Sequence, residues 1–196
     1  PLFLSPTAMQ RLYHHDGDKA SARAAEKFGT FYSMSTMATS SIEEISNISE
    51  GPKLFQLYIH KDQSLTDNLI DRCKSSGFKG LCLTVDTVVA GNRERDHRTG
   101  FTTPPKLTLE SLMSFAAHPT WTMNYLTHGK FELANVAHFT KNGSSIAKGV
   151  MEYINEQYDP AMSWKDAEYC VKRWKGPFAL KGLMSVEDAK KAVDIG

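Results

Sequence analysis

The sequence is poor in the features that mark several large classes of protein. Its three cysteines, Cys73, Cys82 and Cys170, are far apart and form no CxxC pair, which argues against a disulfide framework or a metal site and favours a reducing compartment. No apolar run is long enough to span a bilayer, and no signal peptide is visible, although Pro1 already opens a strand-like segment. The net charge is only +1, so charge gives no argument for a nucleic-acid partner.

Short apolar strands alternate with amphipathic helices along most of the chain. With 196 residues and 41% hydrophobic content, the chain can bury a sizeable core. Strands are expected at Leu2–Leu4, Phe31–Ser35, Leu54–Tyr58, Gly80–Asp86 and Phe178–Lys181. Helices are expected at Asp16–Phe28 (with an Ala-rich face of Ala20, Ala24 and Ala25), after Ser41, at Gln63–Ser76, after Ser163 and after Ser185.

Repeated βα units imply an α/β protein with a parallel sheet. The chain has no Rossmann glycine fingerprint, which favours a TIM (β/α)8 barrel. A complete barrel of this kind needs roughly 250 residues. Residues 1–196 are therefore predicted to form one partial barrel domain with about five of the eight strands.

One long segment, residues 101–158, interrupts this pattern after the strand Gly80–Asp86. We call it the excursion. It contains Pro104-Pro105 and several aromatic residues, among them Phe115, Trp121 and Tyr125. One interpretation is a set of small helices that covers the top of the barrel. The other is a surface for a partner or a membrane, and the sequence leaves both open.

Polar residues follow the expected strands at the barrel end where catalysis takes place. Gln56 can donate and accept hydrogen bonds, which matches the edge of a heteroaromatic ring, and Thr84 could add another bond. Lys181 would place a positive charge near such a ring and stabilise electron density that builds there. Together these residues favour a flavin over a sugar or a phosphate.

Substrate-binding groups are expected beside that ring. Tyr58 and Asp86 each follow a ring-binding candidate by two positions, so strand alternation puts each pair on one side. A tyrosine hydroxyl can bind a substrate oxygen, and a carboxylate can orient an imidazolium. Arg93 suits a substrate carboxylate through a bidentate pair, unless it is a solvated loop charge.

Several segments in the same order resemble the family of FMN-dependent 2-hydroxy acid dehydrogenases and oxidases. They are SPTAMQ, STMATSSIEE, FQLY, LTVDT followed by GNRERD, DPAMSWKD, and PFALKGLMSVEDAKKAVDIG. AAHPTWTMNYL and FELANVAHF are similar to the bacterial L-lactate dehydrogenase branch.

The resemblance implies FMN as the cofactor and a role for each matching residue. The backbone of Pro6, Thr7 and Ala8 would line the flavin, Ser35, Gln56 and Thr84 would hydrogen-bond it, and Lys181 would lie near N1 and O2. Tyr58 and Arg93 would hold the substrate, and Asp86 would pair with the catalytic histidine. Met37 stands where several relatives carry a bulky substrate-facing residue, and Val88 replaces a common proline.

The same resemblance shows which parts of the family's active site do not occur in this sequence. The proton-abstracting histidine and a second substrate arginine would lie in a SNHGGR-like segment, which the chain does not contain. A glycine- and arginine-rich site for the flavin phosphate and an N-terminal tyrosine are also absent. His14 and His15 are interpreted as structural or peripheral. His60 is the only other candidate for the base near the barrel mouth, and the favoured interpretation is a solvent-facing loop histidine.

The expected activity of the full-length protein is FMN-dependent oxidation of a short L-2-hydroxy acid, most simply L-lactate to pyruvate. Quinone, a cytochrome or oxygen would be the electron acceptor, so an oxidase of the glycolate type is an alternative. A catalytically incomplete fragment and an FMN-dependent isomerase are further alternatives. The resemblance also implies a homo-oligomer located in the cytoplasm, with peripheral contact at the inner face of the cell membrane if quinones are reduced.

Overall fold

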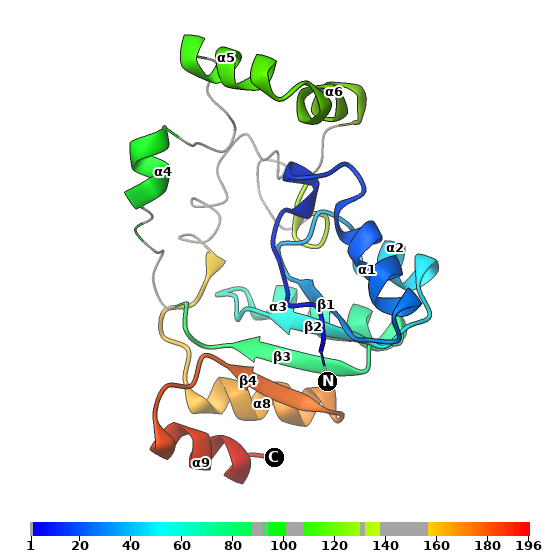
Figure 1. Cartoon of the computed structure of the whole chain (residues 1–196). Coiled ribbons are helices and arrows are strands. Elements are labelled where there is room, and N and C mark those ends of the chain that lie inside the picture. The colour runs from blue at the N-terminus through cyan, green and yellow to red at the C-terminus, as the bar shows by residue number, and fades with distance from the viewer. Residues whose placement is uncertain (1, 88–91, 93, 101–107, 130–131, 138–156) are drawn as a thin grey trace.

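The computed structural model describes residues 2–87, 92, 94–100, 108–129, 132–137 and 157–196. Its centre is a parallel four-stranded sheet in the order β1-β2-β3-β4 (Figure 1). The strands are β1 (Tyr32–Ser35), β2 (Lys53–Leu57), β3 (Gly80–Thr84) and β4 (Phe178–Lys181). The helices are η1 (Gln10–Leu12), α1 (Gly17–Lys27), α2 (Ile42–Ile48), α3 (Gln63–Ser75), α4 (Glu94–Thr99), α5 (Leu109–Ala117), α6 (Pro119–Thr127), α8 (Trp164–Trp174) and α9 (Val186–Asp194).

The helices after β1, β2 and β4 begin where the sequence predicts. At α2 the amide of Glu44 donates to Ser41 Oγ at 3.1 Å, and the Ser41 amide donates back to Glu44 Oε2 at 2.8 Å, which is the expected capping box. At α9 the amide of Asp188 donates to Ser185 Oγ at 3.0 Å. These caps satisfy amides that have no partner inside the helix and fix each helix start.

The expected strand Leu2–Leu4 is reduced to a single parallel bridge between Leu4 and Tyr32. The described sheet therefore has four strands rather than five. Leu2 and Phe3 are 84% and 60% exposed, so little packing holds this segment against β1. Three residues at a sheet edge with one bridge fall short of a strand.

The buried face of α1 does not coincide with the Ala-rich face of the sequence. Ala22 and Ala25 are buried, whereas Ala20 and Ala24 are exposed. The cause is Asp18, a fully buried carboxylate that accepts hydrogen bonds from the Tyr32 hydroxyl at 3.0 Å and, in the loop after β1, from the amide and hydroxyl of Thr39. These bonds turn the helix so that Ala22 and Ala25, four and seven positions after Asp18, face the sheet.

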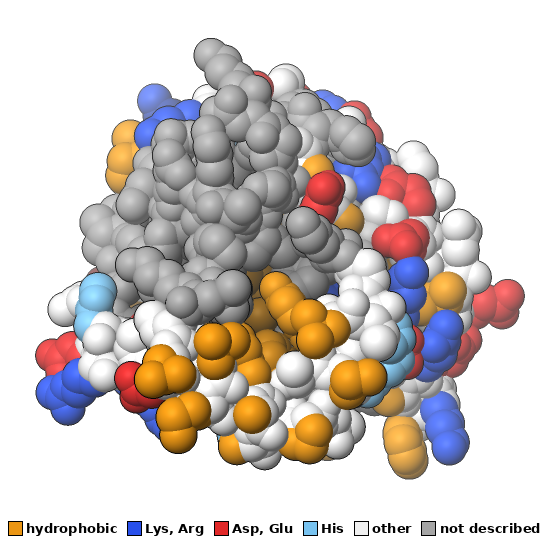
Figure 2. Space-filling model, turned by 90° about the horizontal axis from the view of Figure 1, so that it is seen from above, with side chains coloured by type: hydrophobic (Ala, Val, Ile, Leu, Met, Phe, Trp, Pro, Cys, Tyr) orange, Lys and Arg blue, Asp and Glu red, His pale blue; other side chains and the backbone are white. Residues whose placement is uncertain are grey.

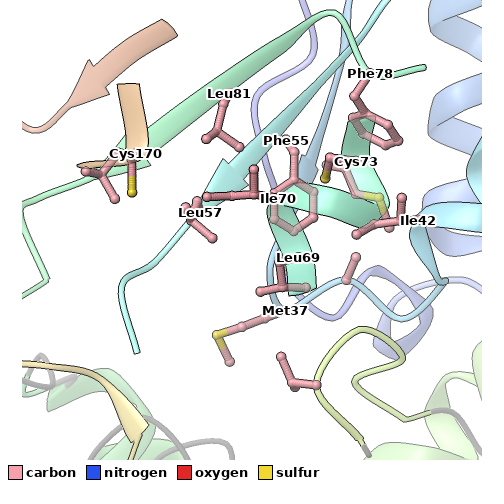
Figure 3. Packing of buried hydrophobic residues seen from close by; sticks show 14 of the residues in the cluster. Met37, Ile42, Phe55, Leu57, Leu69, Ile70, Cys73, Phe78, Leu81 and Cys170 are labelled. Carbon is pink, nitrogen blue, oxygen red and sulfur yellow. The ribbon is translucent and has the colours of Figure 1, made fainter. Parts of the chain in front are cut away.

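A hydrophobic core fills the space between the outer side of the sheet and the helices. Strand residues Phe55, Leu57 and Leu81 are fully buried against α3 residues such as Leu69 and Ile70 (Figure 3). The helices pack in sequence, α1 against α2, α2 against α3 and α3 against α8. Strands inside and consecutive helices outside are the arrangement of a barrel wall.

The described part of the excursion stands above the sheet, with α5 and α6 at the top of Figure 1. Trp121 Nε1 donates to the carbonyl of Leu12 at 2.9 Å, which ties α6 to η1. Asn135, 1% exposed, accepts from the Ile42 amide at 3.0 Å and donates to the Ser40 carbonyl at 3.2 Å. In the described part of the chain, no helix has the length and hydrophobicity needed to cross a membrane.

Candidate active site

Three polar side chains on neighbouring strands form a hydrogen-bonded row at the C-terminal end of the sheet, which we call the strand-end row. Ser35 Oγ donates to Gln56 Oε1 at 3.3 Å, and Gln56 Nε2 donates to Thr84 Oγ1 at 2.9 Å. Their exposures are 4%, 3% and 2%. The parallel register puts Ser35 opposite Gln56 and Gln56 opposite Cys82, so Thr84 lies two residues further along β3, where the Gln56 side chain reaches its hydroxyl.

The strand-end row has the chemistry that the polar edge of a flavin requires. An amide and two hydroxyls can each donate and accept, as alternating ring carbonyls and nitrogens demand. Ser33 lies on the same side of β1 as Ser35, and its buried hydroxyl has no hydrogen-bond partner among the described residues. A buried hydroxyl of this kind gains from a polar ligand, so these residues fit a flavin.

Lys181 and Asp86 form an ion pair next to the row. Lys181 is the register partner of Thr84, and its Nζ lies 3.0 Å from Asp86 Oδ2. Partial burial opposes ionisation of Asp86, but hydrogen bonds from Lys181 and Thr87 and the lysine charge outweigh it and lower the pKa of the carboxyl. The structure therefore joins a residue predicted to stabilise the flavin to one predicted to orient a base.

Gly182 allows this pair to form. Its φ is +108°, and a Cβ at this position would lie 2.5 Å from the Cβ of Asp86 and 2.8 Å from Oδ2. Only glycine combines that backbone conformation with so close an approach. The end of β4 therefore requires glycine at position 182 in addition to the charge of Lys181.

The segment Pro6-Thr7-Ala8 runs along the C-terminal end of β1. The bridge at Leu4 fixes its start, and the amide of Met9 donates to the Met37 carbonyl at 3.0 Å just after it. A cavity of about 400 Å³ beside it opens towards α1, and Thr7 is the one predicted site residue in its lining. This cavity is separate from the strand-end row.

Tyr58 follows β2 and is half-buried. Its amide donates to Thr36 Oγ1 at 3.3 Å, and that hydroxyl donates to the carbonyl of Gln56 at 2.6 Å. The Tyr58 ring stacks on the ring of Tyr158, with centroids 4.5 Å apart. The sequence-based site omitted Tyr158, because no local pattern connects the end of the excursion to β2.

The expectation that His60 faces solvent was wrong. The side chain is 1% exposed, and its ring meets Tyr158 edge-on with centroids 5.7 Å apart. Burial lowers the pKa of His60 to about 4, although the nearby Asp62 charge acts in the opposite direction. His60 is therefore neutral at pH 7 and supports the packing beside Tyr58.

His14 and His15 lie outside the strand-end row, as a peripheral role requires. The ring of His15 stacks on His128 at 4.0 Å and lies 4.2 Å from the ring of His14. Donor atoms of His14, His15 and Asp16 lie within 4.8 Å of one another, a spacing compatible with a metal ion. Their clearest contribution is to join the turn before α1 to the end of α6.

Three further sequence expectations concern Met37, Val88 and Arg93. Met37 is 5% exposed and belongs to the hydrophobic core, near Leu69 (Figure 3). Val88 and Arg93 lie outside the described residues, so the substrate role of Arg93 stays a prediction.

Comparisons with known proteins identify relatives of this chain. Glycolate oxidase 1 of Oryza sativa subsp. indica is 36% identical over 196 residues, covering all of this chain and 47% of the relative. L-lactate dehydrogenase of Allorhizobium ampelinum is 36% identical over 197 residues, covering all of this chain and 52% of the relative. The chain thus spans about half the length of the curated relatives it matches.

The fold of this chain is also similar to that of a solved structure. The crystal structure of the monotopic membrane protein (S)-mandelate dehydrogenase matches with a TM-score of 0.89 and 30% identity, over all of this chain and 52% of that one. The prediction of a partial TIM barrel is confirmed. The family described as FMN-dependent dehydrogenase matches residues 1–196, and the chain belongs to that family.

Proposed function

We propose that the full-length protein containing this chain oxidises a short L-2-hydroxy acid, most simply L-lactate, to the 2-keto acid. The observation that carries the proposal is the buried row Ser35–Gln56–Thr84 with the Lys181–Asp86 pair directly beside it. A row that alternates donors and acceptors suits a planar ring, and the adjacent pair brings charge to the edge of that ring.

The chain's own residues would divide the work between cofactor and substrate. The strand-end row and the backbone of Pro6, Thr7 and Ala8 would hold the ring. FMN, when bound, supplies the two-electron acceptor for oxidation of the hydroxy acid. The Lys181 ammonium would provide positive charge at the ring edge.

Substrate binding is assigned to Tyr58 and Arg93. The Tyr58 hydroxyl would hydrogen-bond a substrate oxygen, and the Arg93 guanidinium would pair with the carboxylate. Asp86 would orient the histidine base that the resemblance assigns to a SNHGGR-like segment. In that arrangement a carboxylate fixes the tautomer of the imidazole and stabilises its protonated form, as in other enzymes with an Asp–His pair.

Anaerobic mixing of the full-length holoenzyme with L-lactate tests the proposal. We expect loss of the oxidised flavin absorbance, and Lys181→Met should slow that loss at least tenfold, because a preorganised charge is removed. Lys172→Met is the matched control: Lys172 is an exposed lysine on α8, and its replacement should leave the rate unchanged. No loss of absorbance with any short 2-hydroxy acid contradicts the proposal.

The electron acceptor separates two versions of this function. Relatives named L-lactate dehydrogenase and glycolate oxidase match the chain with the same identity, 36%. Oxygen consumption and quinone reduction by the lactate-reduced enzyme, measured in parallel, distinguish an oxidase from a dehydrogenase. Faster reoxidation by quinone is expected if the protein works at a membrane.

We further propose that α5 and α6 bring the protein to a membrane surface. Leu109–Thr127 contains a single charged residue, Glu110. Leu112, Met113 and Leu126 are 50%, 68% and 71% exposed. Seen from above, hydrophobic side chains gather beside the residues drawn in grey (Figure 2). A helix pair with a single charged residue and an apolar exposed side suits the interface of a bilayer, and the matched mandelate dehydrogenase is described as a monotopic membrane protein.

Flotation of the full-length protein with phospholipid vesicles tests this assignment. The triple variant Leu112→Ser/Met113→Ser/Leu126→Ser should lose most of its vesicle binding and keep its flavin reduction. Phe28→Ser, at an apolar residue after α1 that is 79% exposed, is the control and should still bind. Equal binding by both variants means that the membrane contact lies elsewhere.

A further inference from the structure

Tyr158 brings an aromatic ring from the end of the excursion to the substrate side of β2. It is 6% exposed, and its ring lies on the Tyr58 ring at 4.5 Å with an angle of 27° between the planes. Offset stacking of this kind is favourable and restricts rotation of both rings. Tyr58 therefore has one face covered by a residue far away in the sequence.

The backbone holds Tyr158 in this place. Tyr158 forms an antiparallel bridge with His60, and the amide of Lys61 donates to the carbonyl of Gln157 at 2.8 Å. The amide of Asp159 donates to the carbonyl of Ile59 at 3.3 Å. Tyr158 is thus attached to the segment that follows β2.

A separate contact fixes the backbone of Tyr58. Its amide donates to Thr36 Oγ1 at 3.3 Å, and Thr36 in turn donates to the Gln56 carbonyl. With the amide held next to the strand-end row and the ring held by Tyr158, two independent contacts determine where the Tyr58 hydroxyl lies. The first contact fixes the backbone from which the side chain starts, and the second restricts the rotation of the ring.

We propose that Tyr158 is a positioning residue: its ring stacks on Tyr58 and holds the Tyr58 hydroxyl at the substrate oxygen. This inference rests on the proposed oxidation of a 2-hydroxy acid, because it concerns the same site. Tyr158 itself does not touch the reacting atoms. Tyr158 acts by restricting the orientation of the Tyr58 hydroxyl, because a hydrogen bond to substrate weakens when its donor samples other directions.

Steady-state kinetics of full-length holoenzyme variants with L-lactate test the proposal. Tyr158→Phe keeps the ring and should stay within about twofold of the wild type, whereas Tyr158→Leu and Tyr158→Ala should lose on the order of tenfold in kcat/KM. Tyr13→Ala removes a tyrosine that is 68% exposed at the turn after η1, and it should leave kcat/KM unchanged.

A double-mutant cycle separates positioning from a general loss of structure. If Tyr158 acts through the Tyr58 hydroxyl, Tyr158→Ala should have little further effect once Tyr58→Phe has removed that hydroxyl. A full additional loss in the Tyr58→Phe background refutes the proposal, as does a Tyr158→Ala enzyme with wild-type kinetics. The ratio of flavin to protein and the urea midpoint, measured for each variant, report any unfolding.

The two proposals fail in different ways. If the wild-type flavin is not reduced by any 2-hydroxy acid, the proposed function is wrong before any variant is compared. If the wild type is active and the two substitutions act additively, only the role of Tyr158 is wrong.

Discussion

Gly182 lies where β4 ends, and its backbone passes close to the side chain of Asp86. Replacing it with alanine should push Asp86 away from Lys181 and strain a backbone with φ of +108°. We expect Gly182→Ala to lower the free energy of unfolding by about 1–3 kcal/mol and to slow flavin reduction. Urea unfolding and anaerobic flavin reduction of the full-length protein measure the two effects.

Gly77→Ala is the control for the strain alone. Gly77 has φ of +71°, but no atom lies within 4 Å of a Cβ added there. This variant should lose about 1 kcal/mol of stability with unchanged flavin reduction. Equal slowing by both variants would mean that contact with Asp86 is irrelevant to the site.

The burial of His60 makes the free energy of unfolding depend on pH. Its pKa falls from 6.5 to about 4 on folding, so the unfolded chain binds a proton that the folded chain does not. Stability is therefore highest above pH 6.5 and falls as the pH drops towards 4. At pH 5 the loss relative to pH 7.5 should be roughly 2 kcal/mol from this residue.

Urea unfolding of the full-length protein at several pH values tests the role of His60. His60→Phe keeps a ring at the position and removes the titration. Subtracting the pH profile of this variant removes the contributions of all other groups. Profiles with the same slope between pH 6.5 and 5 would show that His60 is not the source.

At the residue scale, sequence analysis identified side chains better than their contacts. Ser35, Gln56 and Thr84 could be predicted, because the C-terminal ends of neighbouring parallel strands lie at the same end of the sheet. The pairing of Lys181 with Asp86 could not, since it depends on the approach that Gly182 allows. His60 was misjudged because its burial comes from Tyr158, which no nearby residue signals.

At the scale of whole elements, Asn135 joins the excursion to α2 and α3. Its amide group meets the Ile42 amide and the Ser40 carbonyl, and Arg72 Nη2 donates to its Oδ1 at 3.2 Å. Asn135→Ala should cost about 2 kcal/mol in the free energy of unfolding, because buried donors and acceptors lose their partner.

Asn68→Ala is the matched control for this element. Asn68 is exposed on α3, and alanine has the higher helix propensity, so the change should be neutral or slightly stabilising. Urea unfolding of both full-length variants makes the comparison. A loss below about 0.5 kcal/mol for Asn135→Ala would mean that the excursion contributes little to stability here.

At the element scale, local signals were the reliable ones. Strands β1 to β4 and the starts of α2 and α9 follow from apolar runs and caps a few residues long. Leu2–Leu4 forms only one bridge because it lies at the sheet edge, and the buried face of α1 differs from its Ala-rich face because of the buried Asp18. The excursion was recognised as a unit, but its attachment through Asn135 is a long-range contact that no periodicity encodes.

At the scale of the whole molecule, the sheet has two open edges in the described structure. Leu2, Phe3 and Phe31 are exposed at the edge near β1, and Met184, Val186 and Val193 beyond β4. Relatives about twice as long have further chain to cover such edges. Uncovered apolar side chains beside free strand edges favour aggregation.

The 196-residue chain produced alone should therefore bind a hydrophobic dye, associate and remain colourless with added FMN. The full-length protein should be yellow and bind little dye. Dye fluorescence, light scattering and flavin absorbance measure these differences. A monomeric, yellow preparation of residues 1–196 would contradict this expectation.

The bond between Asn135 and the Ile42 amide also has a consequence for biosynthesis. The two residues are 93 positions apart, so a ribosome adding 5–20 residues per second needs roughly 5–20 s to deliver the partner of that amide. Helices form in microseconds, so α2 and α3 can be complete long before Leu133 and Val136 arrive to cover them. For those seconds the nascent chain presents an apolar surface that a chaperone can bind.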